Sequence, residues 1–321
     1  MYEKIKELIE AHPTVIIHRH VRPDPDALGS QLGLKKILED AYPEKKILAV
    51  GEEDPYFHFL GSMDTVKEED YRGAVVIVND TANQERVDGD KYESGSALIK
   101  IDHHPVVDEY GDIQWVESDA SSTSEMIYVL VREIKEWSFS KEAARLLYAG
   151  IIGDTGRFLF PSTTERTFEA ASELIKYDFD RPHLYDSLYK TSLRLARLKG
   201  YILQHITVSE EGHAVIPLPK DVLKKFGIDP LETSQLVGVP GDIEGILSWV
   251  FFVEEDKEIR VRFRSKGPVI NKLAEKYSGG GHAMAAGARA ADWKETEMIE
   301  KELQTLCKEY TKQKLESSSS Y

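Results

Sequence analysis

The sequence contains little cysteine and no long hydrophobic run. A single cysteine, Cys307, among 321 residues excludes a disulfide framework and a metal cluster held by several thiolates. The longest apolar runs, 74–78 and 246–253, are as long as strands and fall short of the ~18–20 residues of a membrane-spanning helix. The first residues carry acids among lysines and lack the apolar segment of a signal peptide. We therefore expect a cytoplasmic protein that does not bind membranes.

Acidic residues outnumber basic ones. The 41 Lys and Arg residues against 56 Asp and Glu residues give a formal net charge of −15. Such a surface repels long nucleic acid on average, so binding of long duplexes is not expected. A small anionic substrate is still compatible with this charge, because local cationic pockets and bound metal ions outweigh the average.

The first part of the chain alternates strand and helix patterns, which predicts a largely parallel, doubly wound α/β sheet. The expected strands are 14–19, 46–50, 74–79, 97–101 and 113–116, and the expected helices are 2–11, 27–40, 124–137, 141–152 and 165–177. Capping boxes from Ser122 to Glu125 and from Ser162 to Glu165 mark two helix starts. We expect this catalytic domain to cover residues 1–187.

The pattern changes in the second part of the chain. A basic helical stretch, 188–205, is predicted to be a linker. Residues 206–311 are predicted to form a smaller α/β domain that binds substrate, with strands at 207–208, 214–217, 248–254 and 259–265 and helices at 219–226, 268–277 and 293–311. The polar segment 312–321 is predicted to be a disordered tail.

A metal-binding pattern follows the first strand, where His20, Asp24 and Asp26 surround two prolines. The prolines favour extended backbone, so the segment leaves the strand as a loop before the next helix begins. Imidazole and carboxylate groups suit hard or borderline divalent cations. In the alternative interpretation, Asp26 only caps the helix and His20 is a surface residue.

Three further loops carry polar residues at comparable positions. Asp80 follows the third strand, Asp102, His103 and His104 follow the fourth, and Asp154 ends a helix between glycines. The carboxyl ends of parallel strands lie at one edge of a sheet, which is where ligands of such folds bind. A turn or helix cap explains Asp80 alone, and a surface pair explains the histidines alone. Together the four loops offer enough ligands for two metal ions with a shared carboxylate, and predict metal-assisted phosphoester hydrolysis.

The motifs HVRPDPDALGS, NDTAN, DHHP and GIIGDTG, in this order, resemble the four motifs of the DHH phosphoesterase superfamily, and GGGH at 279–282 resembles the signature of its associated C-terminal domain. With the RFRSKG segment, the chain is most similar to the NrnA-type nanoRNase/pAp phosphatases of bacteria. This resemblance implies cleavage of oligoribonucleotides of about two to five nucleotides to mononucleotides, and removal of the 3′-phosphate of 3′-phosphoadenosine 5′-phosphate (pAp). It also implies two divalent ions, with manganese preferred and cobalt or magnesium as alternatives.

The resemblance also implies roles for single residues, and Asp80 is shared between the two metal ions. The implied ligands of one ion are His20, Asp24 and Asp80, and those of the other are Asp26, Asp80, His103 and Asp154. Asp102 matches the acid that orients a histidine, and His104 matches the histidine that faces the phosphate. The expected nucleophile is a hydroxide that bridges the ions, while His104 stabilises the developing charge or protonates the leaving group. Asn83 and Arg157 are expected auxiliary substrate contacts, although packing explains either one equally well.

The second domain carries a cationic strand pattern. Arg260, Arg262 and Arg264 alternate with apolar residues, so in a strand the three guanidinium groups share one face and suit a phosphate or carboxylate. The alternative is a solvated hairpin in which they pair with the acids at 254–258. By resemblance, these arginines bind the substrate's other phosphate and nucleotide together with Ser265, Gly280, Gly281 and His282. The glycine run could also be only a turn.

Other functions are compatible with parts of this pattern. A family II inorganic pyrophosphatase shares the four N-terminal motifs, although the arginine strand and GGGH favour a nucleotide. A linear or cyclic dinucleotide phosphodiesterase is a second alternative, and the absence of membrane or sensory segments speaks against its membrane-bound type. A catalytically silent nucleotide sensor is a different class, and the presence of every expected ligand speaks against it. A homodimer is a further expectation, because exposed sheet edges in such folds often pair.

Overall fold

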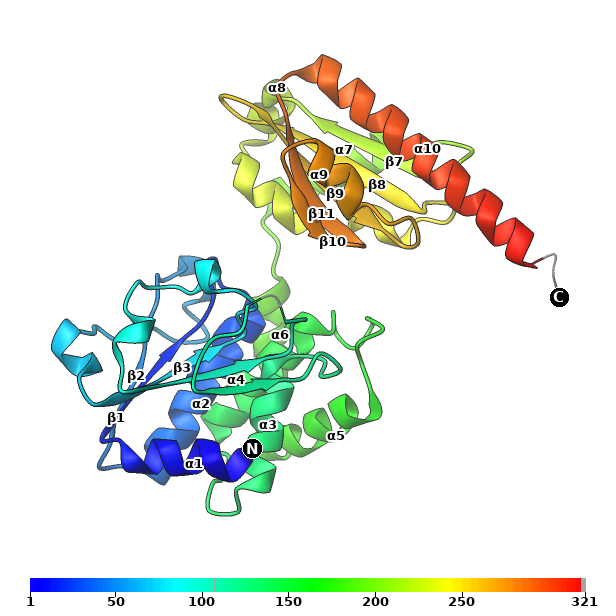
Figure 1. Ribbon diagram of the computed structural model, residues 1–321. Coiled ribbons are helices and arrows are strands. Elements are labelled where there is room, and N and C mark those ends of the chain that lie inside the picture. The colour runs from blue at the N-terminus through cyan, green and yellow to red at the C-terminus, as the bar shows by residue number, and fades with distance from the viewer. Residues whose placement is uncertain (107, 319–321) are drawn as a thin grey trace. The chain divides into compact units, whose positions relative to one another are not determined.

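The computed structural model describes residues 1–106 and 108–318. The chain divides into two compact units, Met1–Lys190 and Thr191–Tyr321 (Figure 1). Among the described residues, no helix combines the length and the apolar character needed to cross a membrane.

The N-terminal unit is built on a parallel five-stranded sheet with the strand order β2-β1-β3-β4-β5. Its strands are β1 (Thr14–His18), β2 (Lys46–Ala49), β3 (Ala74–Asn79), β4 (Ala97–Asp102) and β5 (Ile113–Val116). β3 is buried along its whole length, as expected for a central strand covered on both faces. The predicted α/β class is confirmed.

Helices cover one face of this sheet, and short turns and loops cover the other (Figure 1). The helices are α1 (Tyr2–Ala11), α2 (Pro25–Ala41), α3 (Thr123–Glu133), α4 (Lys141–Asp154), α5 (Glu165–Leu174) and α6 (Arg181–Tyr189). The short 3₁₀ turns are η1 (Pro55–Phe57), η2 (Glu68–Tyr71), η3 (Gln84–Arg86), η4 (Tyr92–Ser94) and η5 (Ile175–Tyr177). Tyr71, Val87 and Tyr110 pack on the face away from the long helices.

Glycines let α2 and α4 pack closely. A Cβ atom added to Gly29 would lie 2.6 Å from the carbonyl oxygen of Leu146 and 2.9 Å from the nitrogen of Gly150. Because these neighbours are backbone atoms that cannot move aside, only glycine allows this approach. The contact fixes the start of α2 relative to the end of α4.

Both helices begin within one residue of the prediction, and one of the two predicted caps is correct. The Ser122 hydroxyl accepts a hydrogen bond from the N–H of Glu125 and caps α3. α5 begins at Glu165, as predicted, but Ser162 is not its cap: Thr164 caps α5 and exchanges hydrogen bonds with Thr167. Threonine at that position forms the same kind of cap two residues further along.

The C-terminal unit contains a mixed six-stranded sheet with the order β10-β11-β9-β8-β7-β6. Its strands are β6 (Thr207–Val208), β7 (His213–Leu218), β8 (Ser248–Glu254), β9 (Ile259–Ser265), β10 (Gly280–His282) and β11 (Ala285–Ala290). Its helices are α7 (Leu193–His205), α8 (Lys220–Phe226), α9 (Asn271–Lys276) and α10 (Trp293–Ser318), with 3₁₀ turns η6 (Pro230–Leu236) and η7 (Val239–Asp242). Only β7 and β8 pair in parallel among these described strands.

Two segments differ from the sequence expectation at the ends of this unit. Most of the predicted linker is α7, whose Leu195, Leu198 and Ile202 are buried in the core of the unit because their spacing places them on one helix face. α10 continues past Thr311, where an end was predicted, because Lys, Gln, Leu and Glu are strong helix formers. The last part of the predicted tail, 319–321, lies outside the described residues.

The alternative interpretation of residues 279–282 as only a turn is wrong. Gly280–His282 forms β10, which pairs in antiparallel fashion with β11 at the edge of the sheet. A Cβ atom on Gly279 would lie 2.0 Å from the carbonyl oxygen of Gly287, so the glycine permits this close pairing. β11 has mostly small side chains, so its sequence lacks the alternation of large apolar and polar residues that predicts a strand.

Candidate active site

The predicted ligand residues come together at the carboxyl edge of the N-terminal sheet. β1, β3 and β4 are neighbours, so the segments that follow them place His20, Asp80 and His103 side by side. Asp26 enters from the start of α2 and Asp154 from the end of α4. Three groups of possible ligands, each with its atoms within 4.8 Å of one another, result from this arrangement.

The first group consists of His20, Asp24 and Asp80. Nε2 of His20 lies 3.6 Å from Oδ2 of Asp24 and 3.4 Å from Oδ2 of Asp80. Nδ1 of His20 lies 2.9 Å from the carbonyl oxygen of Val21 and 3.3 Å from Nη2 of Arg86, so Nε2 is the nitrogen of this ring that faces the carboxylates. Asp24, rather than Asp26, caps α2, because its Oδ1 accepts hydrogen bonds from the N–H groups of Asp26 and Ala27.

The N-terminus of α3 holds Asp26. This carboxylate is fully buried and accepts hydrogen bonds of 2.7 Å and 2.9 Å from the N–H groups of Thr123 and Ser124. Such amides, at the positive end of a helix, stabilise an anion. A Cβ atom on Gly150 would lie 2.0 Å from Oγ of Ser124 and 2.7 Å from Oδ1 of Asp26, so the site needs glycine there.

The second group consists of Asp26, His103 and Asp154. Nε2 of His103 lies 3.0 Å from Oδ2 of Asp154 and 3.5 Å from Oδ1 of Asp80. Nδ1 of the same ring lies 3.3 Å from the carbonyl oxygen of Ala120, which directs Nε2 toward the carboxylates. Asp80 therefore lies between the two groups, one oxygen toward each histidine.

Asp80 has a strained backbone and a supporting contact. Its φ angle of 54° lies in the left-handed region, which costs free energy for a residue with a side chain. Oγ1 of Thr123 donates a hydrogen bond of 3.2 Å to Oδ1 of Asp80. A buried carboxylate held in a strained conformation between two histidines is typical of a functional position.

His104 is oriented by Asp102 and lies at the edge of the cluster. Nδ1 of His104 is 2.9 Å from Oδ1 of Asp102, which also accepts a hydrogen bond from the backbone N–H of His104. The same Nδ1 is 3.4 Å from Oδ1 of Asp80, which gives the third group, Asp80, His103 and His104. With Nδ1 bound to Asp102, Nε2 is the nitrogen that His104 presents to another molecule.

The charges of the cluster fit divalent cations. Burial, together with the charges of Asp80 and Asp154, raises the pKa of Asp26 well above its usual range. Burial opposes protonation of His103, but the neighbouring carboxylates raise its pKa to about 10. Nε2 of His103 is buried and lacks a well-oriented hydrogen bond among the described residues. Carboxylates that repel one another around an imidazole nitrogen, with no thiolate, suit a hard or borderline metal ion.

The sequence interpretation missed a buried ion pair that supports the His20 loop. Arg19 is fully buried; its guanidinium group pairs with Asp88 and donates a 3.0 Å hydrogen bond to the carbonyl oxygen of His20. Asp88 also accepts a 2.8 Å hydrogen bond from the N–H of Glu52. Arg19 stands at the end of a strand pattern, and its partner is 69 residues away, so no local signal indicated the pair.

The two auxiliary residues have no site contact that identifies a role. Asn83 precedes η3 and is half-buried, without a side-chain capping bond. Arg157 is exposed, and its guanidinium group lies 4.6 Å from the centre of the Tyr189 ring. This contact favours the packing alternative for Arg157, while Asn83 stays a prediction.

In the C-terminal unit, sheet register places several predicted residues on one face. Arg262 is opposite Gly287, which is opposite Gly280 on the edge strand. Arg264 is likewise aligned through Ala285 with His282. Residues that are directly opposite in antiparallel strands point to the same face. The two glycines leave room above this face next to the arginines.

A cavity of about 210 Å³ opens on this surface. It is lined by Arg260, Val261, Arg262, Ser278, Gly279, Gly287, Ala288 and Arg289. Burial and the charges of Arg260 and Arg264 lower the pKa of Arg262 to about 10. Arg262 donates a hydrogen bond of 2.7 Å to Oγ1 of Thr233, a neutral partner. A half-buried guanidinium group beside other cations suits an anion such as a phosphate.

The other residues predicted to bind substrate do not share the surroundings of Arg262. Arg260 pairs with Glu255 through two hydrogen bonds, which is the alternative considered for this residue. Arg264 donates to the carbonyl oxygen of Phe263, and Ser265 accepts from the N–H of Gly267. Arg264, Ser265 and His282 are not among the described residues that line the cavity.

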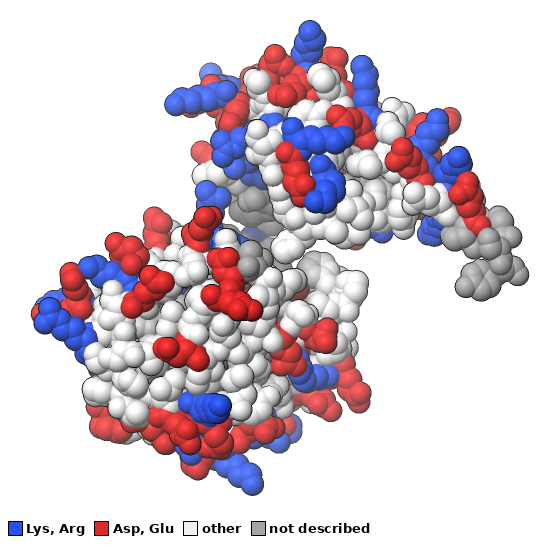
Figure 2. Space-filling model, viewed as in Figure 1, with Lys and Arg blue, Asp and Glu red and all other residues white. Residues whose placement is uncertain are grey.

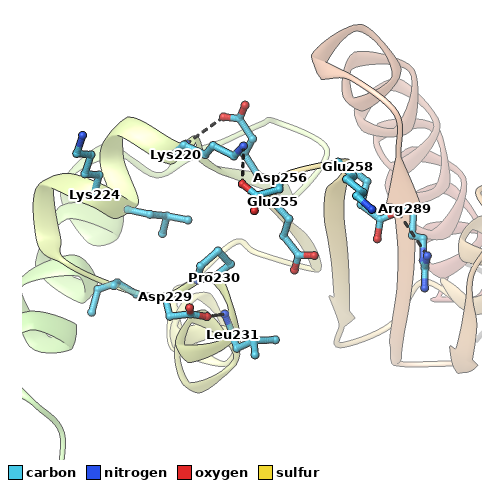
Figure 3. Close-up of a pocket in the computed structure, with 13 residues that line it drawn as sticks. Lys220, Lys224, Asp229, Pro230, Leu231, Glu255, Asp256, Glu258 and Arg289 are labelled. Atoms are coloured by element: carbon cyan, nitrogen blue, oxygen red, sulfur yellow. Dashed lines mark hydrogen bonds and ion pairs between the residues drawn. The ribbon is translucent and has the colours of Figure 1, made fainter.

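A wider, open cavity of about 710 Å³ on the C-terminal unit shares Arg289 with the first cavity (Figure 3). Two ion pairs lie along it: Lys220 lies 3.1 Å from Asp256, and Arg289 lies 3.4 Å from Glu258. Figure 2 shows blue and red side chains interspersed over the visible face of this unit. The arginine surface differs in Arg262, whose guanidinium group has a neutral hydrogen-bond partner.

Comparison with known proteins covers nearly the whole chain. Residues 14–151 match the N-terminal domain of the DHH family, and residues 214–309 match the DHHA1 domain. The chain is 56% identical to the bifunctional oligoribonuclease and PAP phosphatase NrnA of Bacillus subtilis (strain 168) over 312 residues, which cover 97% of this chain and 100% of the relative. It is 46% identical to a probable NrnA of Streptococcus mutans, covering 96% of this chain and 99% of that protein.

A solved structure shares the fold along the chain. The crystal structure of an exopolyphosphatase-related protein from Bacteroides fragilis superimposes with a TM-score of 0.86 at 26% sequence identity. The match covers 96% of this chain and 97% of that chain.

Proposed function

The chain belongs to the DHH family, and from this membership we propose that it is a metal-dependent phosphoesterase with two related activities. It degrades oligoribonucleotides of about two to five nucleotides to mononucleotides, and it removes the 3′-phosphate of pAp to give AMP. The names of the Bacillus subtilis and Streptococcus mutans relatives, which match over nearly their full lengths, support both activities.

The position of Asp80 between two ligand groups is the observation that carries this proposal. Nε2 of His20 approaches one oxygen of Asp80, while Nε2 of His103 approaches the other. Asp26 and Asp154 complete the second group. Two divalent ions held by these residues would neutralise the charge of a phosphoryl group and lower the pKa of a bound water.

The protein's own residues then position the substrate and the leaving group. Water adds to phosphorus, the bond to the ribose oxygen breaks, and that oxygen takes up a proton. His104, whose Nδ1 is held by Asp102, presents Nε2 to the phosphoryl group and stabilises its charge or supplies that proton. The backbone N–H groups of Thr123 and Ser124, at the N-terminus of α3, hold the Asp26 carboxylate by hydrogen bonds that do not require a metal ion.

We assign the arginine surface of the C-terminal unit to the phosphate that is not cleaved. Arg262, with a neutral hydrogen-bond partner and cationic neighbours, is best suited to this role. Arg264, Ser265, Gly280, Gly281 and His282 extend the same surface in this proposal. A separate site for a second phosphate favours substrates of a few nucleotides. Manganese as the preferred ion, a homodimer and a cytoplasmic location stay predictions from the sequence.

The test is hydrolysis of a 5′-labelled five-nucleotide RNA, in parallel with a twenty-four-nucleotide RNA and with pAp. Each is incubated with Mn²⁺ and again with excess chelator. We expect Mn²⁺-dependent conversion of the short RNA to mononucleotides and release of phosphate from pAp, with little cleavage of the long RNA.

Other outcomes identify other functions. Cleavage of pyrophosphate alone would replace the proposal with a pyrophosphatase, and cleavage of dinucleotides alone would replace it with a dinucleotide phosphodiesterase. Calorimetric binding of pAp without release of phosphate would indicate a sensor.

A further inference from the structure

Lys100 is a fully buried lysine in β4, two residues before Asp102. Lysine is almost never completely buried unless its charge is paired. Its neighbours on the strand are apolar and belong to the sheet core, so packing alone would favour another aliphatic residue. The function proposed above has so far given this residue no role.

Four partners surround the Lys100 ammonium group. Nζ donates hydrogen bonds of 2.9 Å to the carbonyl oxygen of Ala82 and 3.2 Å to that of Asp108. It lies 3.6 Å from Oδ2 of Asp102 and 4.4 Å from the centre of the Tyr110 ring. An ammonium group has three protons to donate, and an aromatic face attracts a cation, so these surroundings suit charged lysine.

The two carbonyl groups fix the ammonium group beside Asp102. Ala82 lies in the loop after β3, and Asp108 lies in the loop after β4. Tyr110 donates a hydrogen bond of 2.7 Å from its hydroxyl to the carbonyl oxygen of Thr81, so the ring against Lys100 is itself anchored. Lys100 therefore has little freedom to move away from the carboxylate.

Asp102 connects Lys100 to His104. The carboxyl group is fully buried, and Oδ1 accepts both hydrogen bonds from His104. Oδ2 is buried and has no hydrogen bond among the described residues, which leaves the Lys100 charge at 3.6 Å as its compensation. A buried carboxylate without such compensation is costly, and removing one partner of a buried pair destabilises the other.

We propose that Lys100 is a positioning residue that acts through Asp102 to hold the His104 ring toward the substrate phosphoryl group. This inference rests on the proposed phosphoesterase function. The contacts that Lys100 makes are with Ala82, Asp108, Asp102 and Tyr110, and none of these belongs to the candidate metal ligands. It keeps Asp102 in the orientation in which Oδ1 accepts the Nδ1–H of His104, so that Nε2 faces the reacting group.

The test is a double-mutant cycle between Lys100→Met and His104→Ala, measured with pAp and saturating Mn²⁺. Lys100→Met alone should lower kcat by about 10- to 100-fold, because a residue that orients a functional group contributes on that scale. In the His104→Ala background, the same substitution should change kcat by less than about threefold, since residues that act as a unit are not additive. KM for pAp and the Mn²⁺ affinity measured by calorimetry should change little in Lys100→Met.

Controls separate this role from a structural one. Lys35→Met removes a half-buried ion pair with Asp64 in another part of the unit and should leave kcat and KM unchanged. If Lys100→Met does not fold, Lys100→Gln takes its place in the cycle, and Lys100→Arg, which keeps the charge, should lose less kcat than Lys100→Gln.

The outcomes are distinct. Equal losses from Lys100→Met with and without His104, or a loss of Mn²⁺ affinity that matches the loss of kcat, would overturn the inference. Failure of all three Lys100 variants to fold would also overturn it, since the role would be structural. A wild-type protein that releases no phosphate from pAp would contradict the proposed function instead.

Discussion

The backbone N–H of Ser124 donates a 2.9 Å hydrogen bond to Oδ1 of Asp26, although 98 residues separate the two positions. This contact means that the first turn of α3 supports a carboxylate of the candidate metal centre. The close packing of α2 and α4 at Gly150 creates the space in which it forms. The site is therefore sensitive to changes in helix packing as well as to loss of its ligands.

Gly150→Ala should damage both stability and activity. The added Cβ atom would lie 2.0 Å from Ser124 Oγ and 2.7 Å from Asp26 Oδ1, so the structure must shift. We expect a loss of about 1–3 kcal/mol in the free energy of unfolding, as for overpacked cores, together with a lower kcat.

The matched control is Gly200→Ala in α7, where an added Cβ atom meets no heavy atom within 4 Å. Alanine is a better helix former, so this variant should gain about 0.4–1 kcal/mol. Denaturant titration and pAp hydrolysis measure both variants. A Gly150→Ala protein as stable and active as the wild type would contradict the packing argument.

Asp80→Asn should abolish most turnover because it weakens the carboxylate that both ligand groups share. Residues that only hydrogen-bond to metal ligands typically contribute about 10- to 100-fold to metal affinity or activity. Loss of the shared ligand itself should therefore lower kcat by at least about 100-fold. Asp40→Asn, which alters an exposed ion pair with Lys36, is the control and should retain full activity. Steady-state phosphate release from pAp with Mn²⁺ measures the difference, and near wild-type activity of Asp80→Asn would exclude the shared-ligand arrangement.

Arg262→Ala should chiefly raise KM for pAp and for short RNA. Loss of a hydrogen bond to a charged group is worth about 1.5–3 kcal/mol, which corresponds to about 10- to 100-fold in affinity. Arg260→Ala should have a smaller effect, because Glu255 already neutralises this arginine. Initial rates over a range of substrate concentrations distinguish the two variants. Equal effects would mean that the Glu255 pair opens when substrate binds.

Much of the site could be predicted because ligands at the ends of strands leave a local signal. An apolar run followed by Asp80, or by Asp102 and His103, is visible in the sequence, and parallel topology brings such ends together. The same is true of Arg260 and Arg262, whose alternation fixes a common face in β9.

The missed features depend on long-range contacts. Nothing near Arg19 indicates Asp88, and nothing near Lys100 indicates that its charge lies beside Asp102. β10 was missed because glycines and small residues pair as strands only when the neighbouring strand approaches closely. Burial and pairing between distant strands determine these contacts, and the local sequence propensity of the residues does not indicate them.

The number of Mn²⁺ ions bound per chain tests the central claim most directly. Metal-free wild-type protein and Asp80→Asn are each dialysed to equilibrium against Mn²⁺, and the bound metal is measured by atomic absorption. The account predicts two ions per wild-type chain and weaker binding of both in Asp80→Asn. One ion or none in a folded wild-type protein that hydrolyses pAp would contradict the two-metal site.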